Sequence, residues 1–143
     1  MNISIINGPN LNLLGKREPD IYGNHSFESF FAELQGRYKK VTLSYLQSNS
    51  ETAIIDRLQK DGYTADGILL NAAAYTHTSV AIRDAIAAIP TDVLEIHISN
   101  IFAREEFRHK TLIGPVCKGS ISGLGFLGYQ LGIEYFLNHV KKK

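Results

Sequence analysis

The 143-residue chain lacks several features that mark secreted or membrane proteins. Its one cysteine, Cys117, excludes an internal disulfide framework and is typical of proteins in a reducing cytoplasm. No apolar run approaches the roughly 20 residues of a membrane-spanning helix. Segment 1–10 has no basic residue, and Asn, Gly and Pro interrupt its apolar run, which argues against a signal peptide. We therefore expect a cytoplasmic protein that is not bound to a membrane.

The chain also lacks an excess of either charge. Its formal net charge is +1, and a basic tail at 141–143 supplies three of the cations, so the remainder is slightly acidic. A nucleic-acid partner would call for a basic surface, and none is expected. Hydrophobic residues make up 44% and charged residues 20%, which is typical of a globular domain. The length predicts one catalytic domain over residues 1–143.

Common metal and cofactor motifs are missing as well. The histidines do not occur in HxxxH or HExxH spacing, and a lone cysteine offers no thiolate cluster, so no metal site is expected. Neither GxGxxG nor a Walker motif follows the first β-rich run, and GxSxG is absent. A phosphoacceptor domain would carry acidic residues at the ends of its first and third strands, where this chain has Asn7 and Asn71.

What the chain does contain is an alternation of short β-rich runs with stretches of helical period. The predicted strands are 2–7, 41–47, 67–71, 93–97 and, less sharply bounded, 116–122. Strand–helix units in this order predict an α/β fold, a flavodoxin-like doubly wound sheet of five parallel strands. Right-handed crossovers favour the strand order 2-1-3-4-5.

Apolar residues at helical spacing predict the helices. Ser26 suits the N-cap of the first. Its apolar stripe is Phe27, Phe30, Phe31, Leu34 and Tyr38. The second helix ends at Gly62 and is marked by Ile54, Ile55 and Leu58. The third runs from about Thr78 to Ile89, before Pro90. The apolar residues of the last are Phe126, Leu127, Leu131, Phe136, Leu137 and Val140.

Polar side chains gather at the carboxyl ends of the predicted strands, where open α/β sheets bind ligands. They are Asn7, Asn10, Asn12, Lys16, Arg17, Tyr22, Asn71, Tyr75, Thr76, His77, Glu95, His97, Ser99, Asn100 and the segment 119–123. An asparagine at a strand end is more often a turn former than a ligand, but three around one proline shift the balance. The clustering predicts a functional site at this edge.

Two pairs of these residues are candidates for proton transfer. Glu95 and His97 share one face of a strand, so the carboxylate can fix the imidazole tautomer; the alternative is a buried core histidine. Arg17 precedes Tyr22 in a glycine-bounded loop at about 16–24, where the cation would stabilise a phenolate. Such a loop would act as a lid on closure, whereas the simpler interpretation is a surface aromatic in a turn.

Two arginines follow the fourth predicted strand. Arg104 and Arg108 are either surface residues balanced by Glu105 and Glu106 or ligands of a small anion. From the residues alone, a carrier of FMN or of a small anion on the same fold remains an alternative to an enzyme. A carrier would not need proton-transfer residues, and the chain lacks an obvious phosphate-binding loop.

Together these motifs resemble those of type II 3-dehydroquinate dehydratases over the whole chain. The matching segments are 7–15 (NGPNLNLLG) with Arg17 and 22–23, 47–49 (QSN), Asn71 with 74–79 (AYTHTS) and 83–84, 95–100 (EIHISN), 104–108 (REEFR) and 119–125. Two segments depart from the family pattern. Ala72-Ala73 stands where Pro-Gly is usual, and Ser50-Glu51-Thr52 stands where His-Glu-Gly is usual.

The resemblance implies a lyase that dehydrates 3-dehydroquinate to 3-dehydroshikimate through an enolate, without metal, cofactor or Schiff base. The reaction serves the shikimate pathway or quinate breakdown. By the same resemblance Tyr22 is the base and Arg17 holds its charge, Asn10 stabilises the enolate through a water, and His97, oriented by Glu95, is the acid. The implied substrate-binding residues are Asn71, His77, Asp84, Ile98, Ser99 and Arg108. The family assembles as trimers and dodecamers, in which Asp84 would reach a neighbouring subunit's site.

Overall fold

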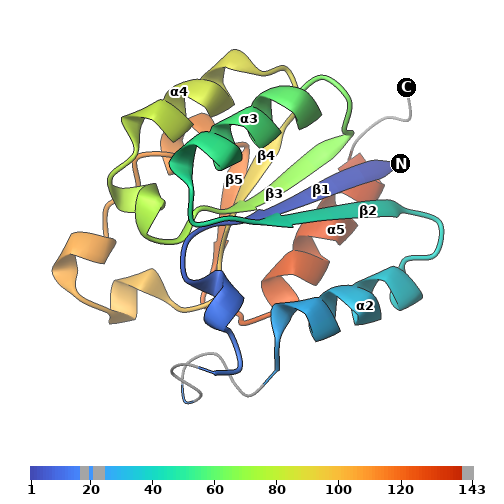
Figure 1. The fold of residues 1–143 in the computed structure, drawn as a ribbon, viewed down its shortest axis with the longest axis horizontal. Helices are drawn as coiled ribbons and strands as arrows, with labels where there is room; N and C mark the ends of the chain where they lie inside the picture. The colour runs from blue at the N-terminus through green and yellow to red at the C-terminus, as the bar shows by residue number, and fades with distance from the viewer. Residues whose placement is uncertain (17–19, 21–24, 140–143) are drawn as a thin grey trace.

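Five parallel strands form one sheet in the order β2-β1-β3-β4-β5 in the computed structural model, which describes residues 1–16, 20 and 25–139 (Figure 1). The strands are β1 (Asn2–Asn7), β2 (Thr42–Gln47), β3 (Gly67–Asn71), β4 (Val93–His97) and β5 (Gly119–Ser122). This arrangement confirms the predicted α/β fold and strand order. The carboxyl ends of β1, β3 and β4 lie side by side, because β1 and β4 pair with opposite edges of β3.

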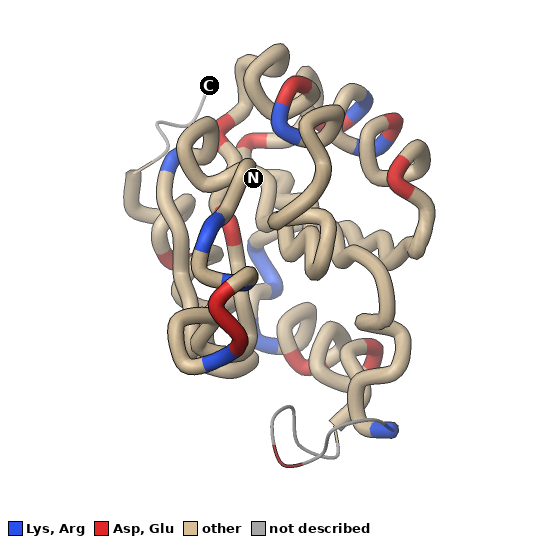
Figure 2. Tube along the Cα trace, turned by 90° about the vertical axis from the view of Figure 1, so that its left-hand side faces the viewer, with Lys and Arg blue, Asp and Glu red and all other residues tan. Residues whose placement is uncertain are grey.

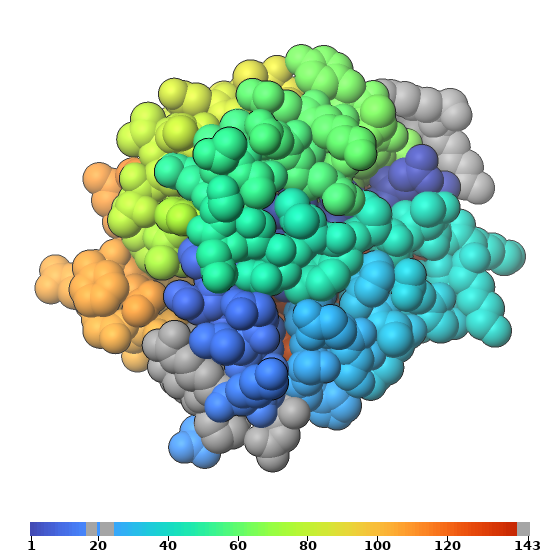
Figure 3. Space-filling view, in the orientation of Figure 1, coloured from blue at the N-terminus to red at the C-terminus, as the bar shows by residue number. Residues whose placement is uncertain are grey.

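Four helices cover the two faces of the sheet. They are α2 (Phe27–Arg37), α3 (Glu51–Asp61), α4 (Val80–Ala88) and α5 (Leu127–His139). Helices α2 and α5 lie on one face, and α3 and α4 lie on the other (Figure 1). In the space-filling view, β1 is largely hidden behind β2, α2 and α3 (Figure 3).

Serine hydroxyls cap three of these helices at their amino ends. Ser26 accepts a hydrogen bond from the Ser29 backbone N–H, as expected, and Ser50 and Ser79 cap α3 and α4 in the same way. Each cap satisfies a backbone donor that has no partner inside its helix. The caps therefore determine the residue at which each of these helices begins.

The core has two parts, one on each face of the sheet. Strand residues alternate between them, so Ile3 and Ile5 pack toward α2 and α5, whereas Ile6 packs toward α3 and α4. All of β3 is buried, as expected for a central parallel strand. By the same alternation Asn7 and Asn71 lie on the α2/α5 side, and His97 lies on the opposite side.

The last helix differs from its sequence-based prediction in the face that it buries. Leu127, Leu131 and Leu137 are 50%, 40% and 39% exposed. The buried residues of α5 are Gly128, Tyr129, Gly132, Ile133 and Phe136. The prediction is confirmed for Phe136 and wrong for the three leucines, because glycine carries no hydrophobic signal although it allows the helix to approach the sheet closely. Val140 lies outside the described residues.

The fifth strand is shorter than expected. It begins at Gly119, because the segment Gly114–Val116 forms a short 3-10 helix that Pro115 opens. In the described part of the chain, no helix has the length and apolar character that crossing a membrane requires. Acidic and basic residues are interspersed along the Cα trace drawn in Figure 2.

Candidate active site

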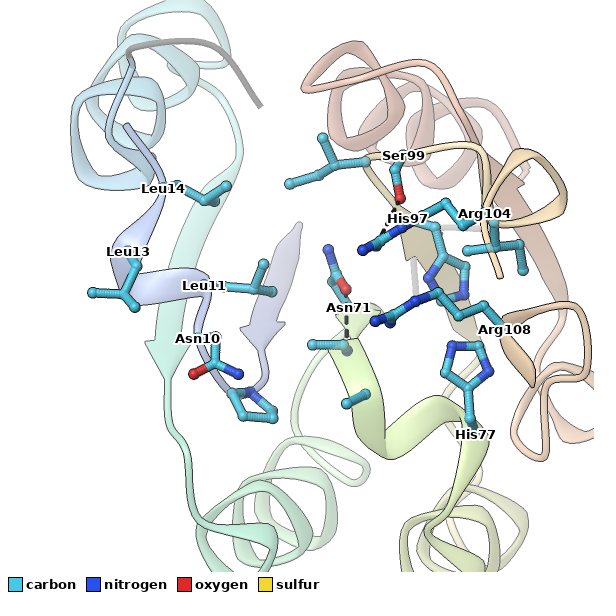
Figure 4. A pocket seen from close by; sticks show the side chains of 15 residues that line it. Asn10, Leu11, Leu13, Leu14, Asn71, His77, His97, Ser99, Arg104 and Arg108 are labelled. Carbon is cyan, nitrogen blue, oxygen red and sulfur yellow. Dashed lines mark hydrogen bonds between the residues drawn. The ribbon is translucent and has the colours of Figure 1, made fainter. Parts of the chain in front are cut away.

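A pocket opens at the carboxyl ends of β1, β3 and β4, where the sequence predicts the site (Figure 4). It is lined by Pro9, Asn10, Leu11, Leu13, Leu14, Asn71, Ala73, Ala74, His77, His97, Ile98, Ser99, Ile101, Arg104 and Arg108. The space between these residues is about 800 Å³, part of it open to solvent. Its mixture of apolar walls with a few convergent polar groups suits a small polar molecule.

The loop after β1 brings Asn10 to this pocket. The Gly8 backbone N–H donates to the Asn71 carbonyl oxygen over 2.7 Å. A Cβ at Gly8 would lie 2.5 Å from the Ala72 carbonyl oxygen, so only glycine allows the two loops to approach this closely. Asn10 itself has a left-handed backbone, with φ of 68°, and its N–H donates to the Asn49 side-chain oxygen over 3.0 Å. These contacts hold Asn10 opposite the end of β3.

The centre of one pocket wall is a hydrogen-bonded histidine and glutamate. His97 Nε2 lies 2.8 Å from Glu95 Oε1, and the two side chains are 6% and 1% exposed. Three hydroxyl groups also donate to Glu95: Thr111 to Oε1 over 2.6 Å, Thr76 to Oε1 over 3.2 Å and Ser120 to Oε2 over 2.6 Å. Because these hydroxyls hold both carboxylate oxygens of Glu95 in place, the hydrogen bond between Glu95 Oε1 and His97 Nε2 fixes the orientation of the His97 ring.

Electrostatics keep Glu95 ionised. Burial raises the pKa of its carboxyl group, but the hydrogen bond and charge of His97 and the hydroxyls of Ser120 and Thr111 outweigh that effect and hold the pKa at about 2. With Glu95 ionised, His97 Nε2 is the donor in their bond. The other ring nitrogen, Nδ1, is then the atom of His97 that can exchange a proton with a ligand.

His77 and two arginines complete the polar wall. The His77 ring is nearly parallel to the His97 ring, at 18°, with centroids 6.5 Å apart, and its Nδ1 donates to the Lys110 carbonyl oxygen over 2.7 Å. Arg104 Nη1 donates to Ser99 Oγ over 3.4 Å, and Arg108 Nε pairs with Glu105 over 2.6 Å. Two guanidinium groups at one pocket favour an anionic ligand.

Most of the predicted site residues meet at this pocket. Those that line it are Asn10, Asn71, His77, His97, Ile98, Ser99 and Arg108. Glu95 lies behind His97 rather than in the lining. Asp84 is exposed on α4 and lies outside the pocket lining, whereas Arg17 and Tyr22 fall outside the described residues. Among the described residues, no group of three or more His, Cys, Asp or Glu side chains is placed to hold a metal ion.

Sequence reasoning missed several residues that build the site. Leu11, Leu14 and Ile101 give it apolar walls, and the Thr111 hydroxyl holds Glu95. Ser120, in the predicted segment 119–123, sits opposite Glu95 in the register of β4 and β5 and also donates to its carboxylate. Thr111 lies in an irregular loop and Ile101 begins a short 3-10 helix, Ile101–Ala103, and the local sequence carries no comparable signal for either.

Comparison with known proteins gives consistent results. The family model described as "Dehydroquinase class II" matches residues 1–137. A 3-dehydroquinate dehydratase of Sulfurovum sp. is 53% identical over 135 residues, which are 93% of this chain and 83% of that protein. Another, of Exiguobacterium sp., is 49% identical over 144 residues, covering 100% of this chain and 99% of its own.

Solved structures agree with the sequence relatives. The type II dehydroquinase of Butyrivibrio crossotus superposes with a TM-score of 0.93 at 45% identity, over 96% of this chain and 98% of its own. The type II dehydroquinase of Propionibacterium acnes gives a TM-score of 0.89 at 37% identity, over 94% of both chains.

Proposed function

Because the chain belongs to the class II dehydroquinase family, we propose that it catalyses the dehydration of 3-dehydroquinate to 3-dehydroshikimate in the shikimate pathway. The observation that carries the proposal is the His97–Glu95 pair, with a 2.8 Å hydrogen bond, on a pocket wall that also presents Asn71, His77 and Arg108. The substrate is a small anion with several hydroxyls, which such a wall suits.

The reaction requires three chemical functions. A base removes a proton from C2, next to the ketone, and the electron pair is held as an enolate. The C1–O bond then breaks, an acid protonates the departing hydroxyl to give water, and the ring C1–C2 double bond forms. Because the C2 proton is weakly acidic, a preorganised donor at the enolate oxygen lowers the barrier as well.

Residues of this chain fit these functions. His97, with Nε2 held by Glu95, protonates the leaving hydroxyl through Nδ1, and Asn10 stabilises the enolate oxygen through an ordered water. Tyr22 is the base and Arg17 keeps it ionised; these two assignments come from the family's motif, since both residues lie outside the described part of the chain. The pocket therefore supplies the acid, and the segment around 16–24 supplies the base.

The remaining residues bind the substrate. Asn71 and the backbone and side chain around Ile98 and Ser99 anchor the carboxylate. His77 and Arg108 hold the ring hydroxyls. Asp84, exposed on α4, reaches the pocket of a neighbouring subunit in a trimer or dodecamer. It is not among the residues that line its own pocket, which supports a role in a neighbouring one.

The test is to add 3-dehydroquinate to the protein and follow the ultraviolet absorbance of the conjugated enone. We expect turnover by the wild type and a loss of about 10²–10⁴-fold in kcat for both His97→Ala and Tyr22→Phe, the usual range for losing an acid or a base. Folded wild-type protein that gives no enone at high concentration would overturn the proposal. A yellow colour that persists after purification would indicate a flavin carrier instead.

A further inference from the structure

Behind the pocket, one buried hydroxyl group bridges two asparagines. Tyr129 of α5 is fully buried, and its hydroxyl donates to Asn7 Oδ1 over 2.7 Å and accepts from Asn71 Nδ2 over 3.1 Å. Asn7 and Asn71 face each other in the register of β1 and β3, at the carboxyl ends of both strands. The two bonds thus join the last helix to the strands that border the pocket.

The direction of each hydrogen bond in the series Asn7–Tyr129–Asn71 follows from one backbone group. The Ala73 N–H can only donate, and it lies 3.2 Å from one end of the Asn71 amide, so that end is the oxygen Oδ1. The other end, Nδ2, therefore faces Tyr129. Since the Tyr129 hydroxyl accepts a hydrogen bond from Asn71, it donates its own hydrogen to Asn7. Turning the Asn71 amide over would break both of its bonds.

This order determines what Asn71 presents to a ligand. Its oxygen is engaged by Ala73, and one of its two amide hydrogens is engaged by Tyr129. The second amide hydrogen is left to serve the pocket, which Asn71 lines. Burial raises the pKa of Tyr129 above its usual value, so the hydroxyl remains neutral near pH 7 and keeps its hydrogen bonds to Asn7 and Asn71.

We propose that Tyr129 is a positioning residue, which holds the Asn71 amide so that it offers an N–H donor, and not its carbonyl oxygen, to the carboxylate of the substrate. The inference rests on the proposed function for the identity of that carboxylate. An asparagine free to turn over would place its oxygen against the anion in part of the molecules, and binding would weaken.

The first test is Tyr129→Phe, which keeps the buried ring and removes only the hydroxyl. We expect KM to rise about tenfold or more, as for the loss of one hydrogen bond to a charged group, with kcat changed less than about threefold. Tyr38→Phe is the matched control. It also removes a hydroxyl from a buried ring, but Tyr38 lies at the carboxyl end of α2 and its hydroxyl interacts with Glu134 rather than with Asn7 or Asn71.

A double-mutant cycle separates positioning from a general loss of stability. In an Asn71→Ala background, Tyr129→Phe should change KM no further, because the amide through which it acts is gone. Equal KM effects in both backgrounds would overturn the proposal, as would an unchanged KM for Tyr129→Phe alone. If Tyr129→Phe does not fold, Asn7→Ala takes its place, since it removes the acceptor that orients the hydroxyl; there too an unchanged KM contradicts the proposal.

A structural measurement keeps this inference separate from the proposed function. In a crystal structure of ligand-free Tyr129→Phe, we expect the Asn71 side chain to have left the Ala73 N–H, whereas in Tyr38→Phe it should remain there. An Asn71 side chain unmoved in Tyr129→Phe would overturn the proposal. Wild-type protein without dehydratase activity would overturn only the proposed function, and the crystal structures would still decide the role of Tyr129.

Discussion

Glu95 shows how a single residue reconciles burial with charge. Its carboxylate is 1% exposed, and it is stabilised by His97 and by hydroxyls from Thr76, Thr111 and Ser120. Such groups come from four separate parts of the chain, so the local sequence indicated the Glu95–His97 pair but not the hydroxyls around it. The charge that orients His97 is thus maintained by the tertiary structure.

This environment predicts a specific acid sensitivity. The folded state lowers the pKa of Glu95 from 4.5 to about 2, so its stabilising contribution is complete above pH 4.5 and is lost as the pH falls toward 2. The corresponding loss in the free energy of unfolding is about 3 kcal/mol. Denaturant unfolding between pH 6 and pH 2.5 should therefore show a steeper decline for the wild type than for Glu95→Gln.

The control for this experiment is Glu33→Gln, which removes an exposed carboxylate from α2. We expect it to retain the wild-type pH dependence. Parallel stability curves for wild type and Glu95→Gln would show that the Glu95 carboxylate is not the group responsible.

At the scale of elements, the sequence predicted where helices and strands end better than it predicted which helix face is buried or how the turns are shaped. Gly62, Asn71 and His97 end their elements where expected, because glycine and polar residues interrupt clear apolar patterns. The inner face of α5 was missed, because leucines occur around the helix and Gly132 marks the side nearest the sheet. The backbone of Ala73 has φ of 52°, which alanine rarely adopts, so the residue itself did not indicate it; the glycine usual at this position in the family was the available signal.

The turn after β3 is strained at Ala73. A left-handed backbone costs an alanine about 1–2 kcal/mol, and glycine avoids this at a smaller entropic cost. We expect Ala73→Gly to raise the free energy of unfolding by about 0.5–1 kcal/mol and Tm by about 2 °C, measured by thermal denaturation. Ala74→Gly is the matched control: its backbone φ is negative, so the same change should lower stability. A lower Tm for both variants would contradict the argument that the backbone at Ala73 is strained.

The close approach of α5 to β3 gives a second prediction for an element. A Cβ at Gly132 would lie 2.5 Å from the Leu69 side chain, which is fully buried, so Gly132→Ala should destabilise the protein by about 1–3 kcal/mol. At Gly36 in α2 an added Cβ meets nothing within 4 Å. Gly36→Ala should therefore stabilise by about 0.5–1 kcal/mol through its helix propensity. Chemical denaturation measures both, and equal effects would refute the packing argument.

At the scale of the whole molecule, the sheet divides the polar residues between its two faces. Asn7 and Asn71 lie on the α2/α5 side, while Glu95 and His97 lie on the α3/α4 side, and the pocket forms where both sides meet beyond the strand ends. The order of strands and helices, with polar residues at the carboxyl ends of the strands, allowed this edge to be predicted from sequence. The contact of Tyr129 with Asn7, 122 residues apart, could not be predicted, because only the packing of α5 creates it.

The proposed role of Asp84 in a neighbouring site predicts complementation between inactive subunits. Asp84→Ala and His97→Ala should each be nearly inactive alone. Refolded together, they should regain about a quarter of the wild-type activity, because one site in four would combine an intact His97 with an intact Asp84 from its neighbour. Enone formation measures the recovery, and co-purification of the untagged variant with an affinity-tagged one shows whether mixed oligomers have formed.

Asp56→Ala, which removes an exposed carboxylate from α3, is the control and should remain active alone. Mixed oligomers without recovered activity would show that Asp84 does not act across subunits.

The hydroxyls around Glu95 also constrain the timing of the proposed reaction. Both carboxylate oxygens accept hydrogen bonds, and a group with a pKa of about 2 takes up no proton at neutral pH. Glu95 therefore cannot reload His97 from the protein interior after each turnover. In the proposed reaction the replacement proton has to reach His97 from the pocket side, where Tyr22 holds the proton taken from C2. The acid and the base are then regenerated together by a proton transfer across the pocket, and solvent deuterium should slow the step that regenerates the free enzyme.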